Sequence, residues 1–393
     1  MSAENFIEVD SCQCAKDGQS ISGDVFLSEK VKEDGRIVSV LSNGRGSGVK
    51  ASVLATMTAT MALSFMVSRM DICDSGEVIM DALPVINVRK ASYSTFTIVD
   101  MASTGETRIV EHANPPFLLV RPGHEVKVEK TALFPKRWKE RVINHSSFNV
   151  QREDRIVFFS EGLTQAGASN PSSPVPWGLE GVDKFVRQQI SKDPSISARE
   201  LSRRLVARAL ELDGRIAQDD ITCGVVYFRS PRQLLVLTGP PFNRSSDRDL
   251  AAIVEDNPGR KVICGGTTAN ILAGLLKRTL QADHEQSRDA KVPMFSRMRG
   301  FELVTEGALT LGEVLRLLEM ESIPEQMNLN GAALLLNLLL DSDIVKFVVG
   351  TSINLAYHDP TFPVELDLRR NIVKQIARLL ETRYMKRIAI QYI

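Results

Sequence analysis

The sequence predicts two domains, an α+β domain followed by a smaller α/β domain with a mainly parallel sheet. The 393 residues exceed what a single hydrophobic core usually supports. Between residue 23 and about residue 228, short strand-like runs alternate with turn residues, a pattern typical of hairpins and antiparallel sheets. Beyond residue 230, strand-like and helical stretches alternate, which favours a doubly wound sheet. We therefore place the domains at residues 1–230 and 233–393.

The composition limits the classes of partner. Lysine plus arginine and aspartate plus glutamate both number 48, so no overall field attracts nucleic acid or an anionic membrane. The five cysteines are scattered, which suits a reducing compartment. The N-terminus lacks the basic and apolar regions of a signal peptide, and the weakly polar run 53–67 is too short to cross a bilayer. We expect a cytoplasmic protein that binds neither nucleic acid nor membrane.

Strand-like runs separated by turn residues make up the first domain. Dipeptides such as Asp34-Gly35 and Thr104-Gly105 mark the turns. The expected strands cover residues 24–27, 37–41, 94–100, 107–112, 117–121, 125–129, 155–159 and 221–228.

Two helices stand out against these strands. In the first, apolar residues recur every four positions and predict a stripe buried in the core. These residues are Val49, Val53, Met57, Met61 and Phe65. The second covers residues 197–212 and begins with the capping signature Ser197-x-x-Glu200. We expect both helices to lie on a sheet.

The second domain carries a motif that favours an anion. Strands are expected at residues 234–237, 261–264, 301–304, 345–349 and 387–390. The second strand runs into Gly265-Gly266-Thr267-Thr268 ahead of a helix at 271–280. Backbone N–H groups, hydroxyls and a helix N-terminus favour a phosphate or carboxylate, so these four residues are candidate ligands of a small anion. The motif is neither G-x-G-x-x-G nor a Walker loop, and a structural N-cap remains the alternative. Thr305-Glu306-Gly307 and Gly350-Thr351-Ser352 also follow strands and could line the same crevice.

A glycine-rich turn in the first domain is the centre of the functional prediction. It follows the strand at 37–41, carries Gly44, Gly46 and Gly48, and precedes the first helix. Glycines allow positive φ and close approach to a ligand. Four acid or amide motifs, including the Asn43 of this turn, stand at the ends of strand-like runs. Several hard oxygen donors that converge in this way predict a Mg²⁺ or Mn²⁺ site, because carboxylates repel one another unless a cation lies between them. The motifs are Ser22-Gly23-Asp24, Ser42-Asn43-Gly44, Ser160-Glu161-Gly162 and Asp219-Asp220.

In this order, and together with Asn114-Pro115-Pro116 and Ile221-Thr222, the motifs resemble those of the metal-dependent PPM serine/threonine phosphatases of the SpoIIE type. The resemblance covers about residues 15–228. It implies a central β-sandwich with helices on both outer faces and a two-metal centre, with Mn²⁺ or Mg²⁺, at one end. Such a centre would direct a metal-activated water at the phosphorus of a phosphoserine or phosphothreonine.

The resemblance also assigns roles to residues of this sequence. Asp24 would be a metal or water-network acid, Asn43 and the Gly44 carbonyl would stand at the bridging position, and Glu161 and Asp219 would hold the other metal with Asp220 beside it. Asn43 and Glu161 stand where the family has aspartate. Glutamate keeps the charge, whereas an amide offers one neutral carbonyl oxygen. We therefore expect one ion to bind weakly or to be missing.

The resemblance implies a bacterial signalling phosphatase that acts on a phosphoserine or phosphothreonine protein, with the anti-sigma-antagonist type as a candidate. Asn43 leaves two alternatives open. The domain could be a pseudophosphatase that binds a phosphoprotein or ligand without turnover, or it could become active only after Asn43 deamidates. A separate small-molecule enzyme in the second domain is a further alternative, although no nucleophile and base are visible there.

Overall fold

The protein is described here by a computed structural model. It describes residues 5–46, 48–82, 94–124, 126–138, 141–169, 175–282, 295–320, 330–352, 364–384 and 386–393. The chain divides into two compact units, Met1–Ser230 and Pro231–Ile393. Each unit has its own sheets and its own hydrophobic clusters.

The first unit contains two antiparallel sheets that face each other. One has the order β1-β10-β9-β6 and the other the order β2-β3-β4-β5-β8-β7. Their inner faces meet in a cluster to which Leu41 and Ile109 contribute from one sheet and Phe158 and Val226 from the other. The strands are β1 (Phe6–Cys14), β2 (Asp24–Lys30), β3 (Ile37–Gly44), β4 (Ser94–Met101), β5 (Glu106–His112), β6 (Leu118–Val120), β7 (Thr131–Leu133), β8 (Ile143–Asn149), β9 (Arg155–Phe159) and β10 (Ile221–Arg229). The expected β-sandwich is confirmed.

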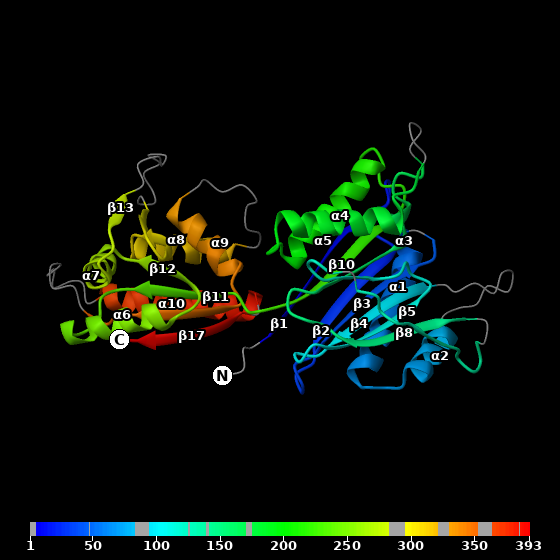
Figure 1. The fold of residues 1–393 in the computed structure, drawn as a ribbon, viewed down its shortest axis with the longest axis horizontal. Helices are drawn as coiled ribbons and strands as arrows, with labels where there is room; N and C mark the ends of the chain where they lie inside the picture. The colour runs from blue at the N-terminus through cyan, green and yellow to red at the C-terminus, as the bar shows by residue number, and fades with distance from the viewer. Residues whose placement is uncertain are drawn as a thin grey trace. The chain divides into compact units, whose positions relative to one another are not determined.

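Helices cover both outer faces of this sandwich (Figure 1). Helices α1 (Gly48–Val67) and α2 (Ile72–Ala82) pack on the six-stranded sheet. Helices α3 (Glu161–Gln165), α4 (Gly178–Lys192) and α5 (Ala198–Leu212) pack on the four-stranded sheet. The predicted cap of α5 is present, because the Ser197 side chain accepts a hydrogen bond from the Glu200 N–H at 3.1 Å.

The expected buried stripe of α1 is wrong for its first three residues, whereas Met61 and Phe65 are partly buried against the core. Val49, Val53 and Met57 are exposed by 63%, 51% and 43%, whereas the buried face consists mainly of alanines. The residues buried on that face are Ala51, Ala55, Thr58, Ala59, Ala62 and Met66. Small side chains let the helix axis approach the sheet closely, which larger ones would prevent. The spacing of four therefore identified the helix but not the face that it buries.

Helix α1 is also longer than the run from which it was expected. Among the described helices it is the one with sufficient length and hydropathy to cross a membrane. Core helices of globular domains pass the same test, and the alanine face of α1 lies on β3, β2 and β4. Packing within the first unit therefore explains the alanine face of α1, whereas Val49, Val53 and Met57 stay exposed.

Three strands of the first unit differ from the prediction. Strands β1 and β8 were not expected, because FIEVDSCQC and INHSSFN carry many polar residues and show no clean alternation. The expected strand at 125–129 is absent from the described residues 126–129, and the chain pairs instead at β7, Thr131–Leu133. Val126 and Val128 still pack against the sandwich core, so burial rather than strand pairing explains their apolar side chains.

The second unit contains one sheet of mainly parallel strands, as predicted. Its order is β13-β14-β15-β12-β11-β16-β17, and the five strands from β15 to β17 in this order are parallel. Strands β13 and β14 add an antiparallel edge. The strands are β11 (Gln233–Thr238), β12 (Arg260–Cys264), β13 (Leu280–Ala282), β14 (Ser296–Met298), β15 (Phe301–Thr305), β16 (Ile344–Val349) and β17 (Arg387–Tyr392).

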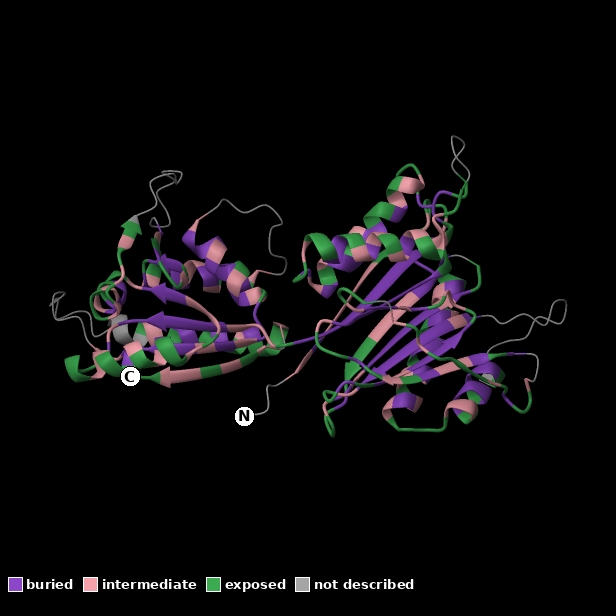
Figure 2. Ribbon diagram, viewed as in Figure 1, coloured by how far each residue is buried: buried purple, intermediate pink, exposed green. Residues whose placement is uncertain are grey.

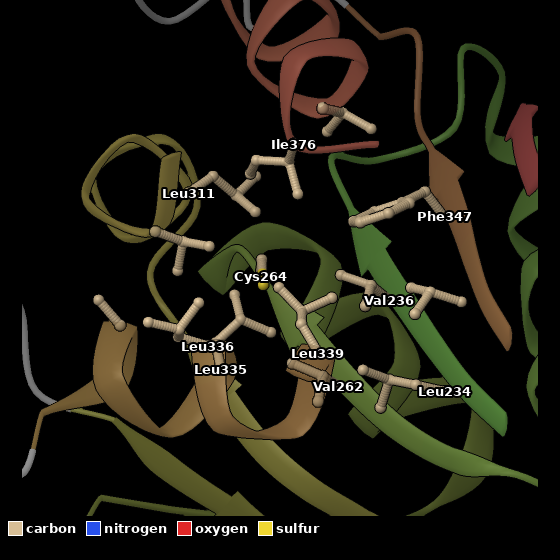
Figure 3. Close-up of a cluster of buried hydrophobic side chains, with 14 of the residues drawn as sticks. Leu234, Val236, Val262, Cys264, Leu311, Leu335, Leu336, Leu339, Phe347 and Ile376 are labelled. Carbon is tan, nitrogen blue, oxygen red and sulfur yellow. The ribbon is translucent and has the colours of Figure 1, made fainter. Parts of the chain in front are cut away.

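Helices cover the two faces of this sheet in separate groups. A 3-10 turn (Arg244–Ser246), α6 (Asp247–Asp256) and α7 (Gly266–Leu276) follow β11 and β12, and the two α-helices pack on one face. Helices α8 (Ala308–Glu319), α9 (Gly331–Leu340) and α10 (Val364–Tyr384) pack on the other face, where Leu311, Leu336 and Ile376 surround Val236 and Val262 (Figure 3). The strand order therefore reverses between β11 and β16, and this is a topological switch point.

The central strands of both units are largely buried, and exposed residues gather on the outward surfaces of the helices (Figure 2). One boundary in the second unit needs correction. The helix expected at 271–280 begins at Gly266 and ends at Leu276, so Thr267 and Thr268 belong to its first turn. The residues at 280–282 form strand β13.

Candidate metal centre

Strand pairing places Asp24 directly opposite Asn43. Strand β2 begins at Asp24, β3 ends at Gly44, and the register aligns Asp24 with Asn43. The Gly44 N–H donates to the Gly23 carbonyl at 2.9 Å, which closes the ladder at this end. Two motifs that are about twenty residues apart in the sequence thus form one wall of the site.

Asp220 connects this wall to the other sheet of the sandwich. It is buried, and its two carboxylate oxygens accept hydrogen bonds from the backbone N–H groups of Lys16, at 3.0 Å, and Gly23, at 2.9 Å. Both oxygens are therefore engaged in holding the turn that carries Asp24. Asp220, predicted beside the metal ligands, thus also positions this turn.

Asp24 is the buried acid of the site. Its side chain is 3% exposed, and within the described part of the chain neither carboxylate oxygen has a hydrogen-bond partner of normal geometry. Burial raises its pKa to about 7; the nearby hydroxyls of Ser160 and Thr222 oppose this rise, and the charges of Asp220 and Asp219 add to it. A buried carboxylate without a partner is costly, and a cation at this point would remove the cost.

Glu161 and Asp219 lie at the rim. Glu161 is exposed at the first position of α3, where it accepts a hydrogen bond from Gln165, and Asp219 is partly buried. A Cβ on Gly162 would overlap the backbone oxygen of Asp220 and lie 3.4 Å from the Cβ of Asp219. The glycine therefore allows the start of α3 to approach the Asp219-Asp220 turn, which brings the two rim acids to the same end of the sandwich.

Three polar residues of the predicted motifs, Ser160, Asn114 and Thr222, hold the strand ends in place. The Thr222 N–H donates to the Ser160 hydroxyl at 3.0 Å and thereby ties β10 to the end of β9. Asn114 bonds the side chains of Thr95 and Thr97 on β4, and Thr95 is the partner of Asn43 in the ladder. Asn114 therefore supports the strand neighbour of Asn43. This connection does not show in the sequence, because 71 positions separate the two asparagines.

These residues fit a hard divalent cation. The donors are one buried carboxylate at Asp24, the neutral oxygens of Asn43 and Gly44, and the two acids at the rim, which are the oxygen types that Mg²⁺ and Mn²⁺ prefer. Among the described residues, no three acids, histidines or cysteines are already grouped as a metal cluster. The site therefore has donors of the chemistry that a hard divalent cation requires.

The pKa of Asp24 predicts a gain in stability for the Asp24→Asn protein without metal. Between the ordinary pKa of 3.8 and about 7, the folded state keeps a proton that the unfolded state has lost, so the carboxylate lowers stability as pH rises through this window. Asn removes this cost. In EDTA at pH 8 we expect the free energy of unfolding to increase by about 2–4 kcal/mol, with a smaller gain at pH 5.

Urea denaturation at both pH values measures this difference. Asp220→Asn is the matched control, and we expect it to destabilise the protein because it weakens an acceptor of two backbone bonds. An Asp24→Asn protein that is less stable than the wild type at pH 8 would show that the carboxylate has a structural partner.

A β-sandwich with helices on both outer faces, and acids at the ends of its strands, is typical of the PPM class of metal-dependent phosphatases. A family model for Stage II sporulation protein E (SpoIIE) matches residues 33–229, just over half of the chain. The chain belongs to this family. The match lies within the first unit, and the second unit is outside it.

Solved structures similar to this chain come from the same class. The phosphatase domain of SpoIIE from Bacillus subtilis is 16% identical over 58% of this chain and 95% of that chain, with a TM-score of 0.43. The RsbU and RsbW domains of a Mycobacterium tuberculosis protein are 18% identical over 65% and 68%, with a TM-score of 0.45. The catalytic domain of the serine/threonine phosphatase PstP, in complex with two manganese ions, is 12% identical over 57% and 99%, with a TM-score of 0.39. No match was found among curated proteins.

Proposed function

We propose that the first unit is a metal-dependent serine/threonine protein phosphatase whose metal centre is weakened at Asn43. The observation that carries this proposal is the buried carboxylate of Asp24, which among the described residues has no hydrogen-bond partner of normal geometry and lies opposite Asn43 at the end of the sandwich. A buried acid without a partner is retained at a cost in stability, and a function that needs a cation accounts for that cost.

Five groups of the chain would bind the metal ion, and Asp220 would position them. Asp24, Asn43, the Gly44 carbonyl, Glu161 and Asp219 would hold Mn²⁺ or Mg²⁺. When bound, such a cation offsets charge on the phosphoryl oxygens and activates water. The backbone bonds of Asp220 keep the Asp24 turn in place for this role.

Two exposed cations flank the glycine turn and suit a phosphorylated substrate. Arg45 follows Gly44 directly, and Lys50 lies in the first turn of α1. Their charges would attract the phosphoryl group toward the metal site. The substrate that family membership favours is a phosphoserine or phosphothreonine protein of a bacterial signalling pathway in the cytoplasm, with the anti-sigma-antagonist type as the leading candidate.

Hydrolysis of a phosphoserine peptide by the full chain tests this proposal. We expect turnover with Mn²⁺, none in EDTA, and a loss of at least about tenfold for Asp219→Ala, because a rim carboxylate that holds the metal is removed. Asp183→Ala is the matched control, since Asp183 is an acid on α4 that pairs with Arg187 on the surface. We expect it to keep the rate of the wild type.

The neutral Asn43 favours one second candidate, a pseudophosphatase that binds a phosphoprotein without turnover. Equal background rates for the wild type and Asp219→Ala, together with Mn²⁺-dependent binding of the peptide, would establish that candidate. The same rate of turnover in Mn²⁺ and in EDTA would contradict both candidates, because both require a bound metal ion.

A further inference from the structure

The carboxyl edge of the parallel sheet in the second unit brings three glycines together. The register aligns Thr238 at the end of β11 with Cys264 at the end of β12 and with Val349 at the end of β16. The next residue on each strand is glycine, at 239, 265 and 350. Because the strand order reverses between β11 and β16, this edge is where open α/β sheets bind ligands.

The three glycines differ in the space beside them. A Cβ on Gly350 would overlap the carbonyl oxygen of Pro240, so the loops after β11 and β16 pack directly on each other. A Cβ on Gly265 would instead have the Thr268 hydroxyl at 3.5 Å and the Gly239 nitrogen at 3.8 Å as its nearest neighbours. Gly265 has φ of +142°, a conformation that favours glycine. The space beside Gly265 is therefore bordered by the Thr268 hydroxyl and the Gly239 nitrogen, without overlap.

The Thr268 hydroxyl lies beside Gly265. Thr268 is the third residue of α7 and is fully buried, and within the described residues its Oγ1 has no hydrogen-bond partner. The N-cap of α7 is Gly265, which provides no side-chain cap for the first turn. A buried hydroxyl without a partner costs free energy, and so does an uncapped helix start. One acceptor above Gly265 would satisfy both.

A second buried hydroxyl lies on the neighbouring strand. Thr238 is fully buried at the end of β11, and among the described residues its Oγ1 also has no partner. It lies on the same face of the sheet as Leu234 and Val236, which belong to the cluster that includes residues of α10. The two hydroxyls without a partner among the described residues thus lie at the start of α7 and at the end of β11, on the side of α10.

Arg369 of α10 supplies positive charge at the same place. A Cβ on Gly239 would lie 3.2 Å from the guanidinium carbon of Arg369, and Gly239 in turn adjoins Gly265. The guanidinium presents a planar fork of N–H donors that matches phosphate oxygens. The positive end of the α7 dipole adds to this charge.

The neighbouring helix shows what an occupied helix start looks like in this sheet. In α8 the threonine at the same position, Thr310, is also fully buried, and its Oγ1 has no hydrogen-bond partner in the part of the chain that the structure describes. However, the Glu306 carboxylate accepts a hydrogen bond from the Leu309 N–H at 3.2 Å. The start of α8 therefore already has its anion, whereas that of α7 has an arginine nearby and no acid of its own in the first turn.

We propose that Gly239, Gly265, Thr268 and Arg369 form a binding site for the phosphate group of a small molecule. The α7 N–H groups and the Thr268 hydroxyl would donate to phosphate oxygens, and the Arg369 guanidinium would neutralise their charge. Free phosphate and a nucleotide share this chemistry. The site belongs to the second unit and does not depend on the phosphatase activity of the first.

Isothermal titration of the full chain with inorganic phosphate, pyrophosphate and ADP tests the site. EDTA is present throughout, so that the metal centre of the first unit takes up no phosphate. We expect at least one of the three probes to bind the wild type and sodium acetate at equal ionic strength not to bind. Thr268→Val and Arg369→Gln should each raise the Kd by about tenfold, the loss of one hydrogen bond to a charged group. Thr310→Val should bind like the wild type.

Thermal unfolding separates a ligand role from a structural one. Because the Thr268 hydroxyl has no partner among the described residues, Thr268→Val should unfold at the same temperature as the wild type or higher without a probe. It should also lose the upward shift that the probe causes. A lower unfolding temperature of Thr268→Val without a probe would overturn the proposal, since the hydroxyl would then have a structural partner. Absence of binding of all three probes to the wild type, or a weakening by Thr310→Val as large as that by Thr268→Val, would overturn it as well.

Discussion

Replacing Asn43 with aspartate should increase phosphopeptide hydrolysis at low Mn²⁺ by about 10- to 100-fold, because a second anionic oxygen donor strengthens the binding of a hard cation. Asn43 is the cross-strand partner of Asp24 and is partly buried, so the new carboxylate would lie beside the buried carboxylate of Asp24. Two carboxylates in this arrangement repel each other without metal and are stabilised by it. The gain should therefore be accompanied by a lower stability in EDTA and a larger stabilisation by Mn²⁺.

Titration of the initial rate with Mn²⁺ measures this effect. Asn114→Asp is the matched control, because it introduces the same charge at an amide that is engaged with Thr95 and Thr97 on β4. We expect it to leave the Mn²⁺ dependence unimproved and to destabilise the protein. If Asn43→Asp and the wild type show the same Mn²⁺ dependence, residue 43 does not contact the metal.

The position of Gly44 also bears on the deamidation alternative. Deamidation requires the backbone nitrogen of Gly44 to attack the side chain of Asn43. In the structure this nitrogen lies in β3 and donates to the Gly23 carbonyl at 2.9 Å. The strand therefore holds the nitrogen away from the attack. The mass of the peptide that contains Asn43 and Gly44, taken from active protein, shows directly which residue is present.

Replacing Gly44 with alanine should destabilise the protein by about 3–5 kcal/mol, at the upper end of the effects of single substitutions. A Cβ at this position would overlap the carbonyl oxygen of Ala51 and lie 2.9 Å from its Cα. The atoms in the way belong to the backbone of α1, so no side-chain rotation can relieve the overlap. The helix would have to move off the sheet, and its buried alanines would lose their contacts.

Urea denaturation measures this loss, and Gly46→Ala provides the comparison. Gly46 lies two positions along the same turn, has φ of +106°, and has no atom within 4 Å of an added Cβ. Its substitution should cost only about 1 kcal/mol through backbone strain. Gly44 is not among the positive-φ glycines, so a large cost there reports on the contact with α1. Equal effects of the two substitutions would show that α1 does not approach β3 this closely.

Local signals in the sequence predicted much of the fold. The capping signature of Ser197 and Glu200 located α5, and runs of β-branched residues located β3, β9, β10 and the parallel strands of the second unit. Such signals involve only a few neighbouring residues. They predict the structure correctly where the secondary structure that these residues favour is also the one that the folded protein requires. The same reasoning placed Asp24, Asn43, Glu161 and Asp219 at strand ends, where the structure has them.

Other features depend on contacts between distant segments. The buried face of α1 was mispredicted because hydrophobic periodicity rewards large residues, whereas close approach to the sheet selects alanine and glycine. Strands β1 and β8 carry weak patterns of their own and are held by their partners in the ladders. The register of β3 and β4 places Thr95 opposite Asn43, and Thr95 is hydrogen-bonded to Asn114. No local sequence pattern specifies this register.

The sequence by itself determined the class of each domain, the family, and the residue types available to a metal and to an anion. Only the tertiary structure decided how these residues are used. It assigns both oxygens of Asp220 to backbone N–H groups, buries Asp24 with no partner of normal geometry among the described residues, and brings Arg369 next to Gly239 and the start of α7. The reason is physical: a hydrogen bond or a desolvation cost is a property of an atom and its surroundings, and those surroundings come from segments far apart in the chain.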